Sequence, residues 1–327
     1  MKQFALRQRL PATILIVLHV AVLLAGFLGP YDPAMQNRTL ALVAPMAVHF
    51  FDAHGVFHWR PYVAAAEGSG VYAIRFFVSG SPYRLLGLWN TRTHLFGVDE
   101  PGRVFLLGSD EFGRDQLSRM LSGGLISLAT GWLAALLALS IGLAVGSVAG
   151  FFGGWLDAAL MRVVELFLAL PWLYLLLAVR AVLPLSLSPR VTALVLAAII
   201  GAVGWARPAR LVRGIVLSAR ERDYVYAARG FGASSVYLLR RHCLPETYGL
   251  LATQAALLIP QYMLAEVTLS FVGLGVAEPA TSWGTLLAPL RQVSILASSW
   301  WMVLPAVLVM LASWCFFSLE DAFAEGN

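Results

Sequence analysis

Apolar residues occur along this chain in six long runs that are separated by polar segments. The runs cover roughly residues 12–29, 121–150, 158–183, 191–212, 247–274 and 300–318. Because about 20 apolar residues are needed for a helix to cross the hydrocarbon core of a bilayer, each run predicts a membrane span. The pattern therefore predicts an all-α membrane protein with six transmembrane helices.

The segment between the first two runs, residues 30–118, is polar and too long to be a simple connection. Its stretches VYAIRFFVSG (71–80) and YRLLGLW (83–89) are apolar and aromatic, and glycine and proline bound them, which is typical of short β-strands. We expect a small mixed or mostly β insertion here.

Three histidines of this insertion, His49, His54 and His58, lie close together in the sequence. Histidines four residues apart can share a metal ion on one face of a helix. Gly55 weakens a helix at this point, and no fourth ligand is evident. We predict no metal site.

Arginines cluster in the loop between the fourth and fifth runs and at the adjoining helix end. They are Arg207, Arg210, Arg213, Arg220, Arg222, Arg229, Arg240 and Arg241, against the acidic Glu221, Asp223 and Glu246. Positive residues favour the cytoplasmic side of a membrane, so the loop and both chain termini are predicted to be cytoplasmic and the insertion extracytoplasmic.

The predicted organisation follows from these positions. It comprises an N-terminal tail with the first helix (1–29), the extracytoplasmic insertion (30–118), a core domain with five helices (119–320) that contains the cytoplasmic loop 213–246, and a cytoplasmic tail (321–327).

Composition excludes several classes of function. Lys2 is the only lysine, so this chain has no phosphate-binding loop of the G-x-x-x-x-G-K type. The net charge of +5 reflects topology and does not imply nucleic acid. We find no nucleophile–base pair or zinc-ligand motif, and we expect neither an enzyme nor a cofactor in this chain. Positive residues precede the first apolar run without a small-x-small cleavage site after it, which favours an uncleaved span.

Three local predictions can be made from individual residues or pairs of residues. Asp115 stands before the run QLSRML and is expected to cap a helix N-terminus. Arg162 and Glu165 are three residues apart and are expected to pair along a helix. The two cysteines, Cys243 and Cys315, are expected to be free and buried.

Residues 218–245 form an arginine-rich, glycine-broken stretch that is unusual in so apolar a chain. Ser218 with Glu221 three residues later is a capping-box pattern and predicts a helix that begins at Ser218. An apolar face then recurs at helical spacing, and it consists of Tyr224, Ala227, Ala228 and Phe231.

Gly230 and Gly232 can supply the left-handed conformation that ends this helix. Ser234 or Ser235 is expected to cap a second short helix, VYLLRRHC, which Pro245 is expected to end. Such an elbow of two helices suits insertion into a groove on another protein. A basic amphipathic element on anionic lipid headgroups explains the pattern equally well.

The sequence AARGFGASSVYLLRRHCLP (227–245) resembles the cytoplasmic signature loop of permease subunits in ATP-binding-cassette importers. The pattern of that loop is Glu-Ala-Ala, three residues, Gly, nine residues, Ile-x-Leu-Pro. Five residues fall on its positions, namely Ala227, Ala228, Gly232, Leu244 and Pro245.

Two positions depart from the pattern. Tyr226 replaces its glutamate, which removes any charged contact that the glutamate makes with the ATPase. His242 replaces its isoleucine, and histidine is usual there in the dipeptide, oligopeptide and nickel branch.

Other stretches are similar to the same branch and to its second, C-type permease. They are LLGSDEFGRDQLSRMLSGGLISL (106–128), GFFGGWLDAALMRVVELFLALP (150–171), WARPARLVRGIVLSARERDYV (205–225) and LAEVTLSFVGLGVAEPATSWGTLL (264–287). The resemblance covers most of residues 106–320, and residues 34–104 look like an insertion relative to shorter members.

The resemblance implies the type I importer permease fold in a bacterial or archaeal cytoplasmic membrane. It implies as partners a homologous second permease, two cytoplasmic ATPase subunits that hold ATP and Mg²⁺, and an extracytoplasmic solute-binding protein, besides membrane lipid. Contact with the ATPase is implied for Tyr224, Tyr226, Ala227, Ala228, Arg229, Gly232, Leu244 and Pro245.

Glu266 lies within the fifth run, where a carboxylate is expensive and should face protein or water. It either lines a transport pathway or bonds a neighbouring helix. An ion-driven carrier or channel, and a membrane scaffold whose working part is the 30–118 segment, remain open as alternatives. Within the importer branch, the substrate is expected to be a di- or oligopeptide, with nickel complexes or modified sugars as alternatives.

Overall fold

The computed structural model of the chain describes residues 2–51, 57–64, 70–182 and 187–325. These residues divide into two compact units. The helical unit comprises Met1–Thr13, Leu128–Leu269 and Ala312–Asn327, and the mixed unit comprises Ile14–Ser127 and Ser270–Leu311.

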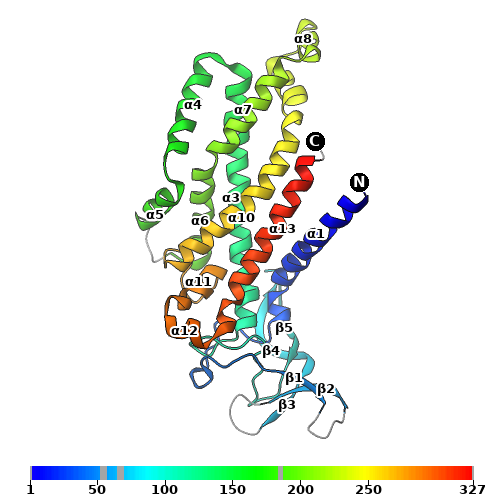
Figure 1. Cartoon of the computed structure of the whole chain (residues 1–327), viewed down its shortest axis with the longest axis vertical. Coiled ribbons are helices and arrows are strands. Elements are labelled where there is room, and N and C mark those ends of the chain that lie inside the picture. Colours follow the sequence, from blue (N-terminus) through cyan, green and yellow to red (C-terminus); the bar gives the residue numbers. More distant parts are fainter. Residues whose placement is uncertain (1, 52–56, 65–69, 183–186, 326–327) are drawn as a thin grey trace. The chain divides into compact units, whose positions relative to one another are not determined.

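Most helices of the helical unit follow the apolar runs of the sequence, whereas α8 and α9 lie in the arginine-rich stretch (Figure 1). They are α4 (Gly154–Ala169), α5 (Trp172–Val182), α6 (Pro189–Gly204), α7 (Ala206–Arg220), α8 (Asp223–Gly230) and α9 (Ser235–Leu238), together with parts of α1 (Lys2–Leu23), α3 (Gln116–Phe152), α10 (Tyr248–Phe271) and α13 (Leu304–Glu325). α8 lies beyond the ends of α7 and α10 (Figure 1).

The described residues contain three helices that are long and apolar enough to cross a membrane, at Gln116–Phe152, Ser235–Phe271 and Trp300–Glu320. A fourth candidate is the pair α6 and α7, which bends by 46°. The first apolar run gives a shorter helix, Arg9–Leu23, within α1. The third run is not one helix as predicted, because Pro171 has no backbone N–H to donate and the chain is extended at Leu170 between α4 and α5.

Three glycines on α3 allow α7 to approach it closely. A Cβ on Gly142 would lie 2.7 Å from the Cβ of Pro208, and one on Gly150 would lie 2.8 Å from the carbonyl oxygen of Arg213. A Cβ on Gly146 would overlap the carbonyl oxygen of Ala209. The four-residue spacing puts all three glycines on one face of the helix, as in the small-xxx-small pattern of membrane helix pairs.

The mixed unit holds the predicted β insertion. Strands β1 (Val48–Phe51), β2 (Phe57–Ala64) and β3 (Val71–Ala73) form an antiparallel sheet, and β4 (Arg75–Leu85) and β5 (Trp89–Gly97) form a separate hairpin in which Arg84 pairs with Asn90. The core beneath them consists of Val63, Ile74, Phe96 and Val104.

Short helices complete the mixed unit. They are α2 (Ala25–Leu28), α11 (Trp283–Leu287), α12 (Val293–Ser298) and the 3₁₀ turns η1 (Arg38–Leu40), η4 (Ala288–Arg291) and η5 (Trp300–Val303). Trp283 is fully buried, and its indole Nε1 donates to the carbonyl oxygen of Met120 at 2.9 Å. A Cβ on Gly124 would lie 2.9 Å from the Trp283 ring.

Candidate functional site

The arginine-rich stretch begins later than its capping pattern predicts. Ser218 lies inside α7, its side chain caps no helix, and α8 begins at Asp223. The prediction of a helix start at Ser218 is wrong. Val212, Val216 and Ala219 form the buried face of α7, and Ala219 extends that face past Ser218. Tertiary packing therefore prolongs the helix and overrides the local signal.

The predicted turn after α8 is present and is made by Gly232. This residue has φ +88, a left-handed conformation that glycine adopts without steric cost. The N–H of Gly232 donates to the carbonyl oxygen of Arg229 at 2.9 Å, and the N–H of Ala233 donates to that of Ala228 at 3.1 Å. Ser234 caps α9 as expected, because its Oγ accepts from the N–H of Tyr237.

Pro245 does not end the second helix, contrary to prediction. A π-helical turn, η2 (Leu239–Cys243), places the N–H of Leu244 on the carbonyl oxygen of Leu239 at 2.9 Å. Pro245 then occupies the start of a 3₁₀ turn, η3 (Pro245–Thr247), where its missing N–H is not needed. The chain therefore continues without interruption into α10.

One side of this stretch is packed and the other is exposed. Val225, Leu238 and Cys243 are fully buried against α7 and Phe151, and Ala228 packs partly against the same cluster. The exposed side carries aromatic and apolar side chains, namely Tyr224, Tyr226, Ala227, Phe231, Val236 and Tyr237. Charged side chains are exposed among them, namely Arg222, Asp223, Arg229, Arg240 and Arg241. Phe231 is 93% exposed.

Polar contacts hold the exposed rings in place. The Tyr224 hydroxyl donates to Oε1 of Glu246 at 3.1 Å, and Arg222 donates to the same oxygen at 3.2 Å. Partial burial, together with the Glu246 carboxylate, raises the pKa of Tyr224 and keeps its hydroxyl protonated. The His242 ring lies 5.6 Å from the Tyr224 ring and 5.8 Å from that of Tyr237.

The other residues predicted to contact the ATPase are divided between the exposed and the packed side of the stretch. The Arg229 guanidinium lies 5.9 Å from the centroid of the Tyr226 ring, an exposed cation–π contact. Leu244 is half-buried and Pro245 exposed. The predicted contact residues are thus close together in the structure but are divided between an exposed and a packed side, and Phe231, the most exposed ring, was not among them.

The base of the stretch is held by two arginines whose contacts the sequence did not reveal. Arg213 donates to both carboxylate oxygens of Asp157, through Nε at 2.5 Å and Nη2 at 2.6 Å. Arg220 donates to the carbonyl oxygens of Gly150 and Phe151 at 3.0 and 3.1 Å. Arg213 and Asp157 are 56 residues apart, so no local pattern in the sequence predicts that they pair. The glycines spaced four residues apart on α3 are a pattern from which its close contact with another helix could have been predicted.

Glu266 lies in α10 and is fully buried. A cavity of about 330 Å³ lies elsewhere in the helical unit, near the break between α4 and α5. Its wall includes Phe167, Leu170, Trp172, Arg207, Gln261 and Tyr262.

The mixed unit contains a buried ionic cluster at the start of α3. Arg114 and Arg119 have side chains only 6% and 2% exposed. Both bond to the half-exposed Glu278, at 2.8 and 2.9 Å, and Arg114 also donates to Asp110 at 2.7 Å. Loop 272–282 is thereby tied to the segment that precedes α3.

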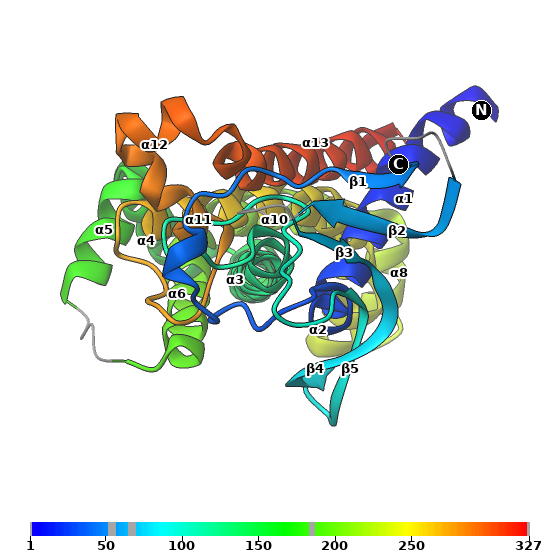
Figure 2. The ribbon, with the colours of Figure 1, turned by 90° about the horizontal axis from the view of Figure 1, so that it is seen from below.

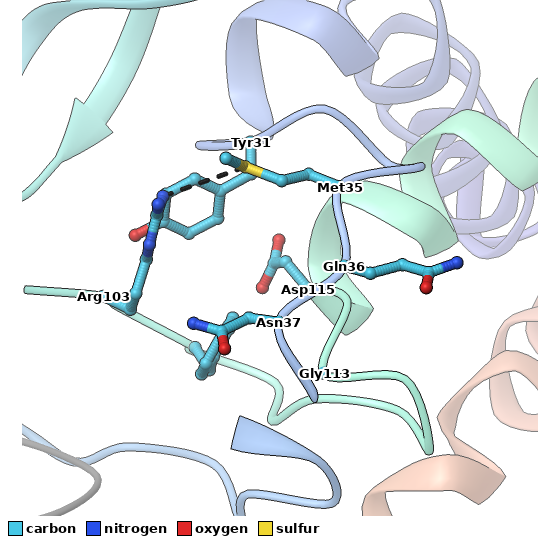
Figure 3. A pocket seen from close by; sticks show the side chains of 8 residues that line it. Tyr31, Met35, Gln36, Asn37, Arg103, Gly113 and Asp115 are labelled. Carbon is cyan, nitrogen blue, oxygen red and sulfur yellow. Dashed lines mark hydrogen bonds between the residues drawn. The ribbon is translucent and has the colours of Figure 1, made fainter. Parts of the chain in front are cut away.

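Asp115 caps α3, as the sequence predicts. Its Oδ2 accepts from the N–H and Oγ of Ser118 at 2.8 and 2.6 Å. Its Oδ1 has no hydrogen-bond partner among the described residues and faces a cavity of about 70 Å³ between Tyr31 and Asn37 (Figure 3). Burial raises the pKa of this carboxyl to about 6, against hydrogen bonds from Ser118 that lower it.

Residues 142–325 match the family of binding-protein-dependent transport system inner membrane components. The match spans more than half of the sequence and includes the whole stretch from α7 to α10. The chain belongs to this family.

Curated relatives agree with the assignment. The chain is 36% identical to a dipeptide transport system permease protein of Bacillus subtilis over 226 aligned residues. These residues make up 69% of this chain and 68% of the relative. It is 34% identical to an oligopeptide transport system permease protein of Haemophilus influenzae over 218 aligned residues, which make up 67% of this chain and 68% of the relative.

Among solved structures, an inward-facing form of the MetNI methionine transporter gives a TM-score of 0.46 at 21% identity, over 63% of this chain and 96% of that one. The family match confirms the predicted permease class and a location in the inner membrane. As a permease subunit, the chain is not itself a catalyst.

Several smaller predictions for this permease can be checked in the structure. Cys243 and Cys315 are free and buried, as expected. Arg162 donates to Glu165 at 3.1 Å, and this pair is exposed. His54 lies outside the described residues, so the histidine cluster is not tested.

Proposed function

We propose that this chain is the C-type permease of an ATP-driven, binding-protein-dependent importer of di- and oligopeptides. The curated relatives at 34% and 36% identity are named as oligopeptide and dipeptide permeases, which supports this substrate class. A second permease, two ATPase subunits that bind ATP and Mg²⁺, and an extracytoplasmic binding protein complete the transporter.

The observation that carries the proposal is the exposed surface of residues 222–245, which we call the coupling segment. Exposed aromatic side chains are unfavourable in water and are enriched where proteins meet. Tyr226 lies in the middle of α8 and Phe231 directly follows its last residue. The small side chain of Ala227 leaves room for a partner protein to approach the helix closely. We infer that an ATPase groove receives this surface.

Each residue predicted to contact the ATPase has a part in this proposal. Tyr226, Ala227 and Arg229 face outward and contact the ATPase directly, and Tyr224 borders them. Ala228, Leu244 and Pro245 support the segment from its packed side and from the turn into α10, and Gly232 shapes the elbow.

Motion of the segment is transmitted through α7. Arg213 of α7 forms an ion pair with Asp157 of α4, and Arg220 of α7 donates a hydrogen bond to the end of α3. When ATP closes the ATPase subunits, the segment and α7 move together and change the packing of α3 and α4. Glu266, buried in α10, is our candidate for a pathway or gate residue. Both chain termini are cytoplasmic in this arrangement.

Copurification with the ATPase subunits in mild detergent tests the docking surface. We expect the double variant Tyr226→Ala, Phe231→Ala to lose at least about tenfold in ATPase retention, since each buried aromatic at an interface contributes about 1–3 kcal/mol. Gly232→Asp should have the same effect by adding a charge and straining the turn.

Trp155→Ala is the matched control, because Trp155 is 81% exposed at the start of α4 and lies outside the coupling segment. It should retain the ATPase. Equal retention by wild type and the double variant would contradict the assigned surface. If wild type itself binds no ATPase, the segment belongs on lipid and the importer assignment fails.

A further inference from the structure

The hairpin of β4 and β5 ends in an apolar tip that nothing in the proposed transport function explains. The tip consists of Leu86, Gly87, Leu88 and Trp89. Leu86 is 49% exposed, Leu88 73% and Trp89 61%.

The turn chemistry of this tip is unsuited to water. Leu86 and Gly87 have φ values of +51 and +74, a conformation for which exposed hairpin turns favour glycine, asparagine or aspartate. This conformation is unfavourable for leucine, because its Cβ comes too close to the following carbonyl oxygen. Apolar side chains at a strained, exposed turn indicate that the tip has an apolar environment in place of water.

The hairpin packs along the end of the first apolar helix. The Tyr83 ring lies against Gly26, and the Phe77 and Phe27 ring centroids are 6.3 Å apart. The buried His94 bonds through Nδ1 to the carbonyl oxygen of Gly29 at 2.7 Å. These contacts place the hairpin beside α2, which directly follows α1 (Figure 2).

The position of α2 sets the depth of the hairpin relative to a membrane. The last turns of α1 expose Ile16, Val17, Val20 and Leu23, an apolar surface suited to acyl chains. α2 therefore lies where the first span leaves the hydrocarbon core. The tip begins three residues beyond Tyr83, about 10 Å along the strand, which is slightly more than the roughly 5–8 Å thickness of one interfacial region and so reaches the boundary of the acyl chains.

Charge on the hairpin agrees with a lipid surface. Arg84 and Arg92 flank the tip, and both are exposed. Neither has a carboxylate within ion-pair distance in the described part of the chain, whereas Arg75 near the root pairs with Asp99 at 2.8 Å. Tryptophan and arginine next to leucine are typical of segments at the boundary between headgroups and acyl chains.

We propose that the hairpin tip inserts into the extracytoplasmic leaflet beside the first span and anchors the mixed unit to the bilayer. The leucines and Trp89 occupy the boundary of the acyl chains, and Arg84 and Arg92 bind phosphate groups of the lipids.

Depth-dependent quenching on the full-length chain in vesicles tests this proposal. Cys243 and Cys315 are first replaced by alanine, and an environment-sensitive fluorophore is attached to Leu88→Cys. The control label is at Val71→Cys, a site 62% exposed on β3, which Figure 1 shows farther from α1. Vesicles consist of phosphatidylcholine with or without phosphatidylglycerol, and carry nitroxide-labelled acyl chains.

We expect the lipid nitroxide to quench the label at position 88 and a water-soluble quencher to spare it, with the reverse at position 71. In a background of Arg84→Gln and Arg92→Gln, the enhancement of quenching by phosphatidylglycerol should be lost. Equal aqueous quenching at both positions would overturn the proposal. Protection at position 88 from both quenchers would also overturn it, because a protein would then cover the tip.

Discussion

Arg213 and Asp157 illustrate how one partly buried ion pair can support a moving element. Two parallel hydrogen bonds join the guanidinium to the carboxylate, and the side chains are 30% and 15% exposed. Lysine cannot reproduce this two-pronged geometry. The pair therefore holds α4 to α7 in a defined orientation.

We expect Arg213→Lys to destabilise the chain by about 1–2 kcal/mol, because it keeps the charge and loses one charge-assisted hydrogen bond. Thermal unfolding in detergent, followed by tryptophan fluorescence, measures this. Arg162→Lys is the matched control, since its pair with Glu165 is exposed and should contribute less than about 0.5 kcal/mol. Equal midpoints for the two variants would show that α7 is held by packing alone.

Asp115 predicts a pH dependence in the mixed unit. Its pKa is about 6 in the folded chain, against 3.8 for an ordinary aspartate, because the buried carboxylate loses its water. Between these two values the folded state binds the proton more tightly than the unfolded state does. Stability is therefore lost as pH rises from about 4 to 6, by roughly 3 kcal/mol.

Asp115→Asn removes this titration and retains a side chain that can cap α3. The unfolding midpoint of the variant should exceed that of wild type by an amount that grows from pH 4 to 6 and is constant above pH 6. A pH-independent difference between the two proteins would mean that the cavity in Figure 3 already hydrates the carboxylate.

At the scale of elements, the contact between α3 and α7 depends on missing side chains. Gly146 and Gly150 let the backbone of α7 lie directly against α3, since an added Cβ would meet backbone oxygens of Ala209 and Arg213. Gly214 on α7 differs, because nothing lies within 4 Å of a Cβ added there.

We expect Gly146→Ala to push α3 and α7 apart and to lower the free energy of unfolding by about 1–3 kcal/mol. ATP-driven transport should also weaken, because α7 is then less firmly supported. Gly214→Ala should instead stabilise the chain by about 0.5–1 kcal/mol through helix propensity. Detergent unfolding midpoints measure both. A neutral Gly146→Ala would show that the two helices already have room to part.

At the scale of the whole molecule, the energy source separates an importer from an ion-driven carrier. We expect the assembly of both permeases, the ATPases and the binding protein in proteoliposomes to take up peptide only with ATP. Ionophores that collapse ion gradients should leave the rate unchanged.

Glu266→Gln should lower this uptake and leave its dependence on ATP intact, because the residue is assigned to the pathway and not to energy coupling. Uptake that an ionophore abolishes would favour a carrier, in which an intramembrane carboxylate binds the driving ion. A chain that supports no uptake with any energy source would act as a scaffold.

The sequence by itself determined the features that depend on neighbouring residues. Apolar runs located the helices, because burial in lipid requires about 20 apolar residues in succession. Gly232 ended α8 and Asp115 capped α3, since backbone conformation and capping are satisfied within a few residues. A β insertion was expected between the first two helices, but the stretch 83–89, expected as one strand, contains the turn between β4 and β5.

Only the tertiary structure decided features that depend on distant partners. α7 continues through Ser218 because its buried face packs on Phe151, and the π turn carries the chain past Pro245 into α10. The pairing of Arg213 with Asp157 joins positions 56 residues apart. Local propensities differ by less than about 1 kcal/mol per residue, and burial of a few apolar side chains exceeds them.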